Sequence, residues 1–171
     1  YQNSLIWVIL RHGPGAGRER KLGTMAERLA GKVAIISGGA TGMGGAASKL
    51  FAAEGAKVGI VDRNPVAAAE TVKAIRDAGG EAMFAVADVS IGSDVLKAVA
   101  AVNDAFGAVT VLFNHAGTIV IKPFLDTTEE EWDWLHNVNV KSMFHMTKAV
   151  LPQMIDAGGG SIVCTSSISA V

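Results

Sequence analysis

Short runs rich in β-branched residues alternate with alanine-rich stretches along the chain from Lys32 onward. Runs of this length and composition predict β-strands, and the longer stretches between them predict helices. The predicted strands cover Val33–Ser37, Lys57–Asp62, 81–88, 109–114 and 161–166. The predicted helices cover 46–54, 65 to about 78, a stretch that ends at 106, and roughly 128–157.

Residues with known preferences for helix ends mark some of these boundaries. Pro65 suits the first turn of the second predicted helix. Ser90 or Ser93 can cap the third, because a serine hydroxyl accepts a hydrogen bond from a first-turn N–H group.

The long helix at 128–157 has stronger signals at both ends. Thr127 with Glu130, or Thr128 with Glu131, has the spacing of a capping box. The three glycines at 158–160 end this helix.

The predicted strands are continuous apolar runs rather than strict alternations of apolar and polar residues. This pattern is typical of strands covered on both faces, as in parallel sheets. Strands that alternate with helices and are joined by short loops imply right-handed βαβ crossovers. The sequence therefore predicts the α/β fold class, with a Rossmann-like, doubly wound parallel sheet.

Residues 1–30 lack this alternation. The apolar run at 5–10 is far shorter than the roughly 20 residues that cross a bilayer, and no basic segment precedes it as in a signal peptide. The stretch at 11–21 is basic and rich in glycine. We expect 1–30 to be a poorly ordered extension and 31–171 to form one domain. Met25 begins a segment typical of a protein start, so 1–24 are interpreted as upstream sequence.

The composition excludes several classes of function. The 171 residues are 50% hydrophobic and 18% charged, which suits a folded domain with a core. A total of 15 Lys and Arg against 16 Asp and Glu gives a net charge of −1, without the basic field of a nucleic-acid-binding protein. One cysteine, Cys164, allows no internal disulfide and no zinc-ligand set. We expect no nucleic-acid, membrane or metal partner, and a reducing, cytoplasmic location.

A glycine-rich segment joins the first predicted strand to the first predicted helix. In such a loop one glycine turns the chain, another lets backbone N–H groups approach a pyrophosphate, and a third lets helix and strand pack closely. The helix N-terminus then faces the negative phosphates. The sequence therefore predicts a dinucleotide site that includes Ser37, Gly38, Thr41, Gly42, Met43 and Gly44.

Asp62 ends the second predicted strand, where a carboxylate can accept hydrogen bonds from the hydroxyls of the adenosine ribose. The same charge would repel the additional phosphate of NADP. Arg63 follows and could pair with that phosphate, so the alternative stays open. NAD is favoured, because the residue before Gly42 is Thr41 and not a basic residue.

Further segments occur in the order typical of short-chain dehydrogenases/reductases, which the sequence resembles over 31–171. The glycine segment is similar to the family pattern Thr-Gly-x-x-x-Gly-x-Gly, with serine as its first residue. The other matching residues are Asp88 and Val89, then Asn114, Ala116 and Gly117, then Asn139, and finally Ser167 after the fifth predicted strand. His115 departs from the usual Asn-Asn-Ala-Gly; packing or a backbone hydrogen bond is its favoured role.

The resemblance implies hydride transfer between a nicotinamide ring and a small alcohol or carbonyl substrate. It implies that Asp88 and Val89 contact the adenine, and that Asn114, Ala116 and Gly117 belong to the cofactor site. It also implies that Ser167 hydrogen-bonds the substrate oxygen, and that Asn139 bends its helix and holds a water in a proton relay. A homo-oligomer is expected for the complete protein.

The family's proton donor is a tyrosine about a dozen residues after the serine, with a lysine four residues later that lowers its pKa. In this sequence Tyr1 is the only tyrosine and Lys148 is the last lysine. We therefore expect a C-terminally incomplete domain, truncated before the Tyr-x-x-x-Lys segment, that binds cofactor weakly and turns over little substrate.

Two alternatives to a dehydrogenase follow from the same residues. The first is a non-catalytic nucleotide-binding or scaffold protein from a truncated gene. The second is a methyltransferase with another adenosine cofactor, which the Asn-x-Ala-Gly and double-serine segments disfavour.

Overall fold

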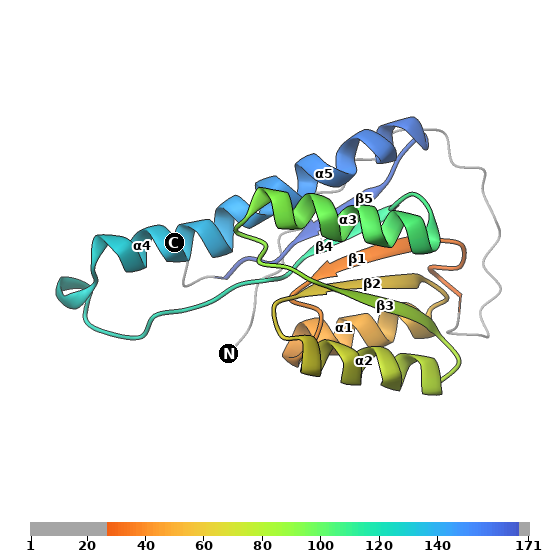
Figure 1. Cartoon of the computed structure of the whole chain (residues 1–171), viewed down its shortest axis with the longest axis horizontal. Coiled ribbons are helices and arrows are strands. Elements are labelled where there is room, and N and C mark those ends of the chain that lie inside the picture. Colours follow the sequence, from red (N-terminus) through yellow and green to blue (C-terminus); the bar gives the residue numbers. More distant parts are fainter. Residues whose placement is uncertain (1–26, 168–171) are drawn as a thin grey trace.

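A parallel sheet forms the centre of the molecule in the computed structural model, which describes residues 27–167 (Figure 1). Its five strands lie in the order β3-β2-β1-β4-β5, and every neighbouring pair is parallel. The strands are β1 (Val33–Ser37), β2 (Lys57–Asp62), β3 (Glu81–Val86), β4 (Val111–Asn114) and β5 (Ser161–Cys164). The doubly wound α/β fold predicted from the sequence is confirmed.

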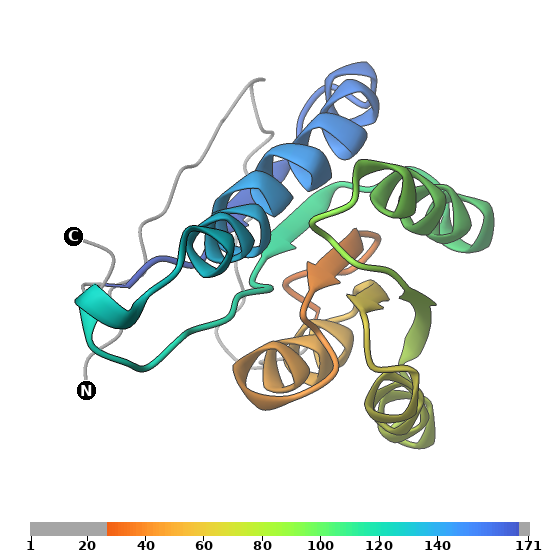
Figure 2. The same ribbon diagram turned by 60° about the vertical axis from the view of Figure 1, so that its left-hand side comes forward.

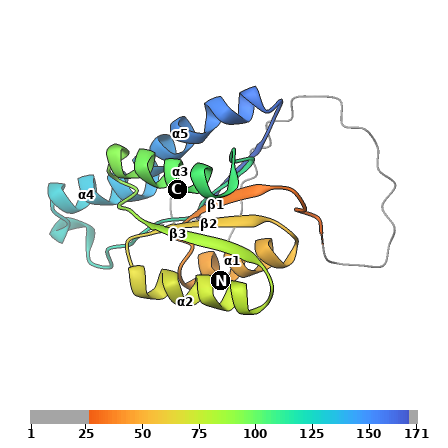
Figure 3. The same cartoon turned by 45° about the vertical axis from the view of Figure 1, so that its right-hand side comes forward.

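Helices cover both faces of this sheet (Figures 2 and 3). On one face lie α1 (Gly42–Ala53) and α2 (Pro65–Asp77), and on the other lie α3 (Gly92–Phe106) and α5 (Ser142–Asp156). A short 3-10 helix, η1 (Phe124–Asp126), precedes α4 (Glu129–His136), and both lie beyond the ends of the strands (Figure 1). None of the described helices is long and apolar enough to cross a membrane.

The side chains of the strands divide between two hydrophobic cores. Val33 and Ile35 of β1 pack with α3 and α5, whereas Ala34 and Ile36 pack with α1 and α2. All four side chains are buried, because a strand covered on both faces needs apolar residues at odd and even positions alike. This explains the continuous apolar runs of the sequence.

The observed helix starts differ from two of the predictions. Helix α1 begins at Gly42 and not at 46, because the glycines of the loop form its first turn. Helix α3 begins after Ile91 without a side-chain cap. Neither predicted serine caps it, and Ser90 donates instead to the Asp88 carboxylate at 2.6 Å.

The long helix predicted at 128–157 is interrupted by a π-helical turn, η2 (Asn137–Lys141), which separates α4 from α5. Its start is the capping box of Thr128 and Glu131. The Thr128 hydroxyl accepts from the Glu131 N–H at 3.3 Å, and the Glu131 carboxylate accepts from the Thr128 N–H at 2.9 Å. The interruption includes Asn139, and the local bend expected there stays a prediction.

The segment before β1 is held against the end of α1. The Arg28 guanidinium donates to the Glu54 carboxylate at 2.7 Å, and the Leu29 N–H donates to the Glu54 carbonyl at 2.8 Å. The hydrogen bond from the Arg28 side chain lowers the pKa of the Glu54 carboxyl group, which is 7% exposed. The extension expected at 1–30 lies, for residues 1–26, outside the described residues.

The centre of β2 carries a glycine because α3 crosses directly above it. A Cβ added to Gly59 would lie 2.5 Å from Cγ2 of Val102, whose side chain is fully buried. We expect Gly59→Ala to lower the free energy of unfolding by about 1–3 kcal/mol through overpacking. Val102→Ala alone should also destabilise, by leaving a cavity.

The double variant Gly59→Ala/Val102→Ala should lose less free energy of unfolding than the two single variants lose together. The reason is that the new methyl group fills the space that valine leaves. Urea denaturation of the three variants and the original chain measures this. Strict additivity would contradict the proposed contact.

Candidate functional site

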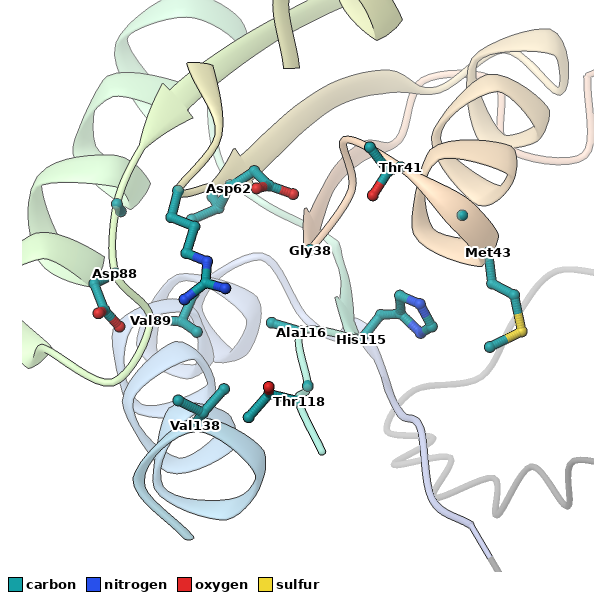
Figure 4. Close-up of a pocket in the computed structure, with 15 residues that line it drawn as sticks. Gly38, Thr41, Met43, Asp62, Asp88, Val89, His115, Ala116, Thr118 and Val138 are labelled. Atoms are coloured by element: carbon teal, nitrogen blue, oxygen red, sulfur yellow. The ribbon is translucent and has the colours of Figure 1, made fainter. Parts of the chain in front are cut away.

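A cleft of about 360 Å³ opens at the carboxyl ends of β1, β2 and β4 (Figure 4). In a doubly wound sheet this is the edge where ligands bind. Its lining includes ten residues predicted from the sequence: Gly38, Thr41, Gly42, Met43, Asp62, Arg63, Asp88, Val89, Ala116 and Gly117. Val61, Ala87, His115, Thr118 and Val138 complete it.

Two glycines let the backbone of the loop approach its neighbours closely. A Cβ added to Gly44 would overlap the carbonyl oxygen of Gly38 and lie 2.9 Å from its carbonyl carbon. Gly38 has φ +67°, and a Cβ there would lie 2.9 Å from Cα of Ala116. Larger residues at these two positions would push α1 away from β1 and the loop after β4.

The N-terminus of α1 opens on the cleft. Thr41 is its N-cap residue but makes no side-chain capping hydrogen bond. The N–H groups of a helix's first turn have no partner within the helix and carry partial positive charge. A negatively charged oxygen in the cleft would be stabilised by these groups.

Asp62 links the end of β2 to the glycine loop. Its carboxylate accepts from the Ala40 N–H at 3.1 Å and, with the other oxygen, from the Asn64 N–H at 3.0 Å. These contacts fix the carboxylate at the rim of the cleft, where Figure 4 shows it near Thr41. Arg63 also lines the cleft.

Asp88 and Val89 follow β3 on the opposite side of the cleft from Met43 (Figure 4). One carboxylate oxygen of Asp88 accepts from the N–H of Ser90 at 2.9 Å and from its hydroxyl. Val89 is buried and belongs to the core beneath α3 and α5. This pair therefore presents one polar and one apolar group to the cleft.

Three predicted residues lie beside the cleft without lining it. The Ser37 hydroxyl accepts from the N–H groups of His115 at 3.0 Å and Ala116 at 3.2 Å, so it shapes the loop after β4. Asn114 is buried below that loop and donates to Thr147 Oγ1 at 3.4 Å and to Cys164 Sγ at 3.5 Å. Gly44 is buried in the first turn of α1.

The Asn139 side chain holds the same loop from the π-turn. Its Oδ1 accepts from the Thr118 N–H at 2.7 Å, and its Nδ2 donates to the Thr118 carbonyl at 2.9 Å. Both polar groups of the amide are thus engaged by one backbone unit. The water expected at Asn139 stays a prediction.

Ser167 is exposed and follows the end of β5 by three residues. It is not among the residues that line the cleft. Its expected contact with a substrate oxygen stays a prediction. No group of three or more His, Cys, Asp or Glu side chains suited to a metal ion occurs within 27–167.

His115 is the cleft residue whose surroundings the sequence indicated least. Its ring packs on Phe113, with 5.1 Å between ring centroids, and its Nδ1 lies 2.9 Å from Thr165 Oγ1. Partial burial lowers the pKa of the imidazole. Its proximity to the cleft could be inferred from the strand end before it, but its side-chain partner Thr165 follows β5 and is 50 residues away in the sequence.

The lowered pKa of His115 gives stability a pH dependence. The unfolded chain, in which histidine has a pKa near 6.5, binds this proton more readily than the folded chain, so acid favours unfolding. The stability contributed by a neutral His115 is complete above about pH 6.5 and decreases as the pH falls below it.

We expect His115→Gln to reduce the decrease in melting temperature between about pH 8 and about pH 5.5, because glutamine does not titrate in this range. Calorimetry of both proteins at the two pH values measures the difference. An equal decrease in both would contradict the assignment of this dependence to His115.

The chain is similar to known dehydrogenases over most of its described length. It is 45% identical over 144 residues to the 2,5-dichloro-2,5-cyclohexadiene-1,4-diol dehydrogenase LinX of Sphingobium indicum, which covers 84% of this chain and 58% of that protein. It is 39% identical over 141 residues to the cyclopentanol dehydrogenase of Comamonas testosteroni, covering 82% and 56%. The chain thus spans a little over half the length of these relatives.

Solved structures agree with the sequence comparison. A protein from Burkholderia xenovorans, described as a short-chain dehydrogenase/reductase, superposes with a TM-score of 0.76 at 34% identity, over 80% of this chain and 56% of that one. A mutant short-chain dehydrogenase/reductase of Serratia marcescens superposes with a TM-score of 0.72 at 30% identity, over 76% and 54%. The short chain dehydrogenase family model matches residues 32–171, and the chain belongs to this family of oxidoreductases.

Proposed function

We propose that the whole protein is an NAD(P)-dependent oxidoreductase that transfers hydride between nicotinamide and an alcohol or carbonyl substrate. The observation that carries this proposal is the contact between Gly44 and the Gly38 carbonyl, where a side chain does not fit. This contact brings the N-terminus of α1 to the cleft, where the N-cap residue Thr41 makes no side-chain capping hydrogen bond. When bound, the nicotinamide would supply or accept the hydride.

The residues around the cleft fit the parts of a dinucleotide. The first turn of α1, with Gly42 and Gly44, would hold the pyrophosphate through backbone N–H groups. Asp62 would accept hydrogen bonds from the adenosine ribose. Asp88 and Val89 would contact the adenine. Ala116 and Gly117 would contact the ribose that is attached to the adenine.

We favour NAD over NADP because of the Asp62 carboxylate. The Ala40 and Asn64 N–H groups hold it at the cleft, so it would have to break these hydrogen bonds to move away from an additional phosphate. Arg63 lines the same cleft and supports NADP as the second possibility.

The substrate proposed for the whole protein is a small secondary alcohol or the corresponding ketone. The names of two relatives describe ring alcohols, a cyclopentanol and a cyclohexadienediol, so alicyclic alcohols are the first class to test. In this proposal Ser167 hydrogen-bonds the substrate oxygen, and Asn139 keeps the loop after β4 in place through Thr118. The inactivity expected of the 171-residue chain stays a prediction.

Nucleotide binding to the 171-residue chain tests the proposal, with NADH fluorescence as the measurement. We expect Gly44→Ala to weaken NADH binding by about tenfold or more, because the added methyl group displaces α1 from the loop. Gly92→Ala is the matched control: it also changes a glycine in the first turn of a helix, but its Cβ would meet the His145 ring at 3.1 Å and no backbone carbonyl.

Equal NADH affinities for the Gly44→Ala variant and the original chain would contradict the role of this contact. A chain that bound S-adenosylmethionine and neither NADH nor NADPH would overturn the proposed function.

The choice between the two nucleotides is tested at Asp62. We expect Asp62→Asn to weaken NADH binding by about tenfold and to affect NADPH less, because the amide keeps the size but loses the charge that binds ribose hydroxyls. Asp126→Asn is the control, because it makes the same change at an exposed aspartate outside the cleft lining, and it should leave NADH binding nearly unchanged. If Asp62→Asn weakened both nucleotides equally, the carboxylate would have no part in selecting between them.

A further inference from the structure

The His115 side chain lies between the first turn of α1, where the nucleotide is expected, and the residues after β5, where the substrate is expected. On one side, a Cβ added to Gly44 in the first turn of α1 would lie 2.8 Å from Cδ2 of the imidazole. On the other side, Nδ1 lies 2.9 Å from Oγ1 of Thr165, just after β5. The ring therefore spans the distance between the glycine loop and the end of β5.

The backbone around this ring is fixed independently of it. The His115 N–H donates to Ser37 Oγ at 3.0 Å, and the ring rests on Phe113. The Thr165 N–H donates to the carbonyl oxygen of Asn114 at 2.9 Å, which continues the ladder between β4 and β5. The hydrogen bond between the two side chains thus joins two backbone segments that are already adjacent.

The two ring nitrogens have different surroundings. Nδ1 is engaged by Thr165, whereas Nε2 makes no hydrogen bond to any residue of 27–167. His115 lines the cleft, and Figure 4 shows its ring between Ala116 and Met43. Partial burial lowers the pKa of the ring, which favours the neutral form with a single N–H.

A neutral imidazole can donate from only one of its nitrogens. If the Thr165 hydroxyl donates to Nδ1, the proton is on Nε2, and the ring offers an N–H donor beside the first turn of α1. That donor would add to the partial positive charge of the helix N-terminus, where the pyrophosphate is expected.

We propose that His115 is a nucleotide-binding and positioning residue: Nε2–H binds a ribose or phosphate oxygen of the cofactor, while Nδ1 holds Thr165 and with it the segment that leads to Ser167. This inference rests on the proposed function, since the ligand is the dinucleotide. Occupation of the cleft favours the Nε2–H form, which requires the Thr165 hydroxyl to donate to Nδ1. Nucleotide binding and the position of residues 165–167 are therefore linked through one ring.

Nuclear magnetic resonance of the ¹⁵N-labelled 171-residue chain tests this at both ends of the contact. The ring-nitrogen signals report the tautomer of His115, and the backbone amide signals report Thr165 and Ser167. Without nucleotide we expect the Nε2–H form to predominate. Added NADH should shift the Nε2 signal of His115 and the amide signals of Thr165 and Ser167.

Thr165→Val removes the hydroxyl with little change of shape. It should lower the fraction of the Nε2–H form, weaken NADH binding about three- to tenfold, and abolish the shift of the Ser167 amide. His115→Ala should weaken binding by a similar factor and also abolish the Ser167 shift. Thr127→Val makes the same change in the segment before α4, away from the cleft lining, and should alter none of these signals.

The outcomes separate the two proposals. If NADH binds the original chain but leaves the His115 and Thr165 signals unmoved, the inference is wrong and the proposed function stands. If Thr165→Val leaves the tautomer unchanged, the hydroxyl does not set it and the inference is also wrong. If neither NADH nor NADPH binds, the proposed function fails, and the inference fails with it.

Discussion

The position of β1 between β2 and β4 determines where chemistry can occur in this protein. From β1 the chain moves outward through β2 to β3, and then returns across the sheet to β4 and β5. The loops that follow β1 and β4 therefore leave the sheet in opposite directions, and a cleft opens between them. The glycine loop, Asp62 and the loop around His115 all meet there because of this one reversal.

The close contact between the loop after β1 and the start of α1 makes the sheet edge useful for binding an anion. Gly44 rests against the Gly38 carbonyl, and Ser48 of α1 donates to the carbonyls of Gly39 at 2.9 Å and Gly44 at 3.0 Å. Thr71 of α2 donates to the Ala40 carbonyl at 2.7 Å. The hydrogen bonds from Ser48 and Thr71 satisfy the carbonyl groups of Gly39 and Ala40 from the side of the helices, which holds the loop in its place beside the cleft.

Much of this arrangement could be predicted from the sequence, because it depends on local signals. The apolar runs located all five strands, and the capping box at Thr128 located α4. The start of α1 was missed because glycine is a poor helix former, and here close packing outweighs that preference. Ser90 does not cap α3 because the N-cap position falls one residue later, at Ile91, and the Ser90 hydroxyl donates to the Asp88 carboxylate.

The partners of His115 and Asn139 could not be predicted in the same way. Each pairing joins residues that are far apart in the sequence, His115 with Thr165 and Asn139 with Thr118. Periodicity and capping preferences report only on neighbours within a turn or two, so they carry no information about such contacts. The resemblance to a family indicated that Asn139 matters, and the structure shows what its side chain holds.

The π-turn at Asn137–Lys141 separates two helices that look continuous in the sequence. An α-helix turns by about 100° per residue, and a π-turn holds one more residue than an α-turn without adding that rotation. The sequence positions after the turn are therefore shifted by about 100° from the stripe that the positions before it define. Residues of α4 and α5 therefore do not share one helical stripe. Removing a single residue here would restore a regular α-helical turn and leave both the core face of α5 and the Trp132 face of α4 in their present directions. The turn therefore changes which sequence positions lie on the buried side of the helix, so that the pattern of buried residues in α5 does not continue the pattern of α4.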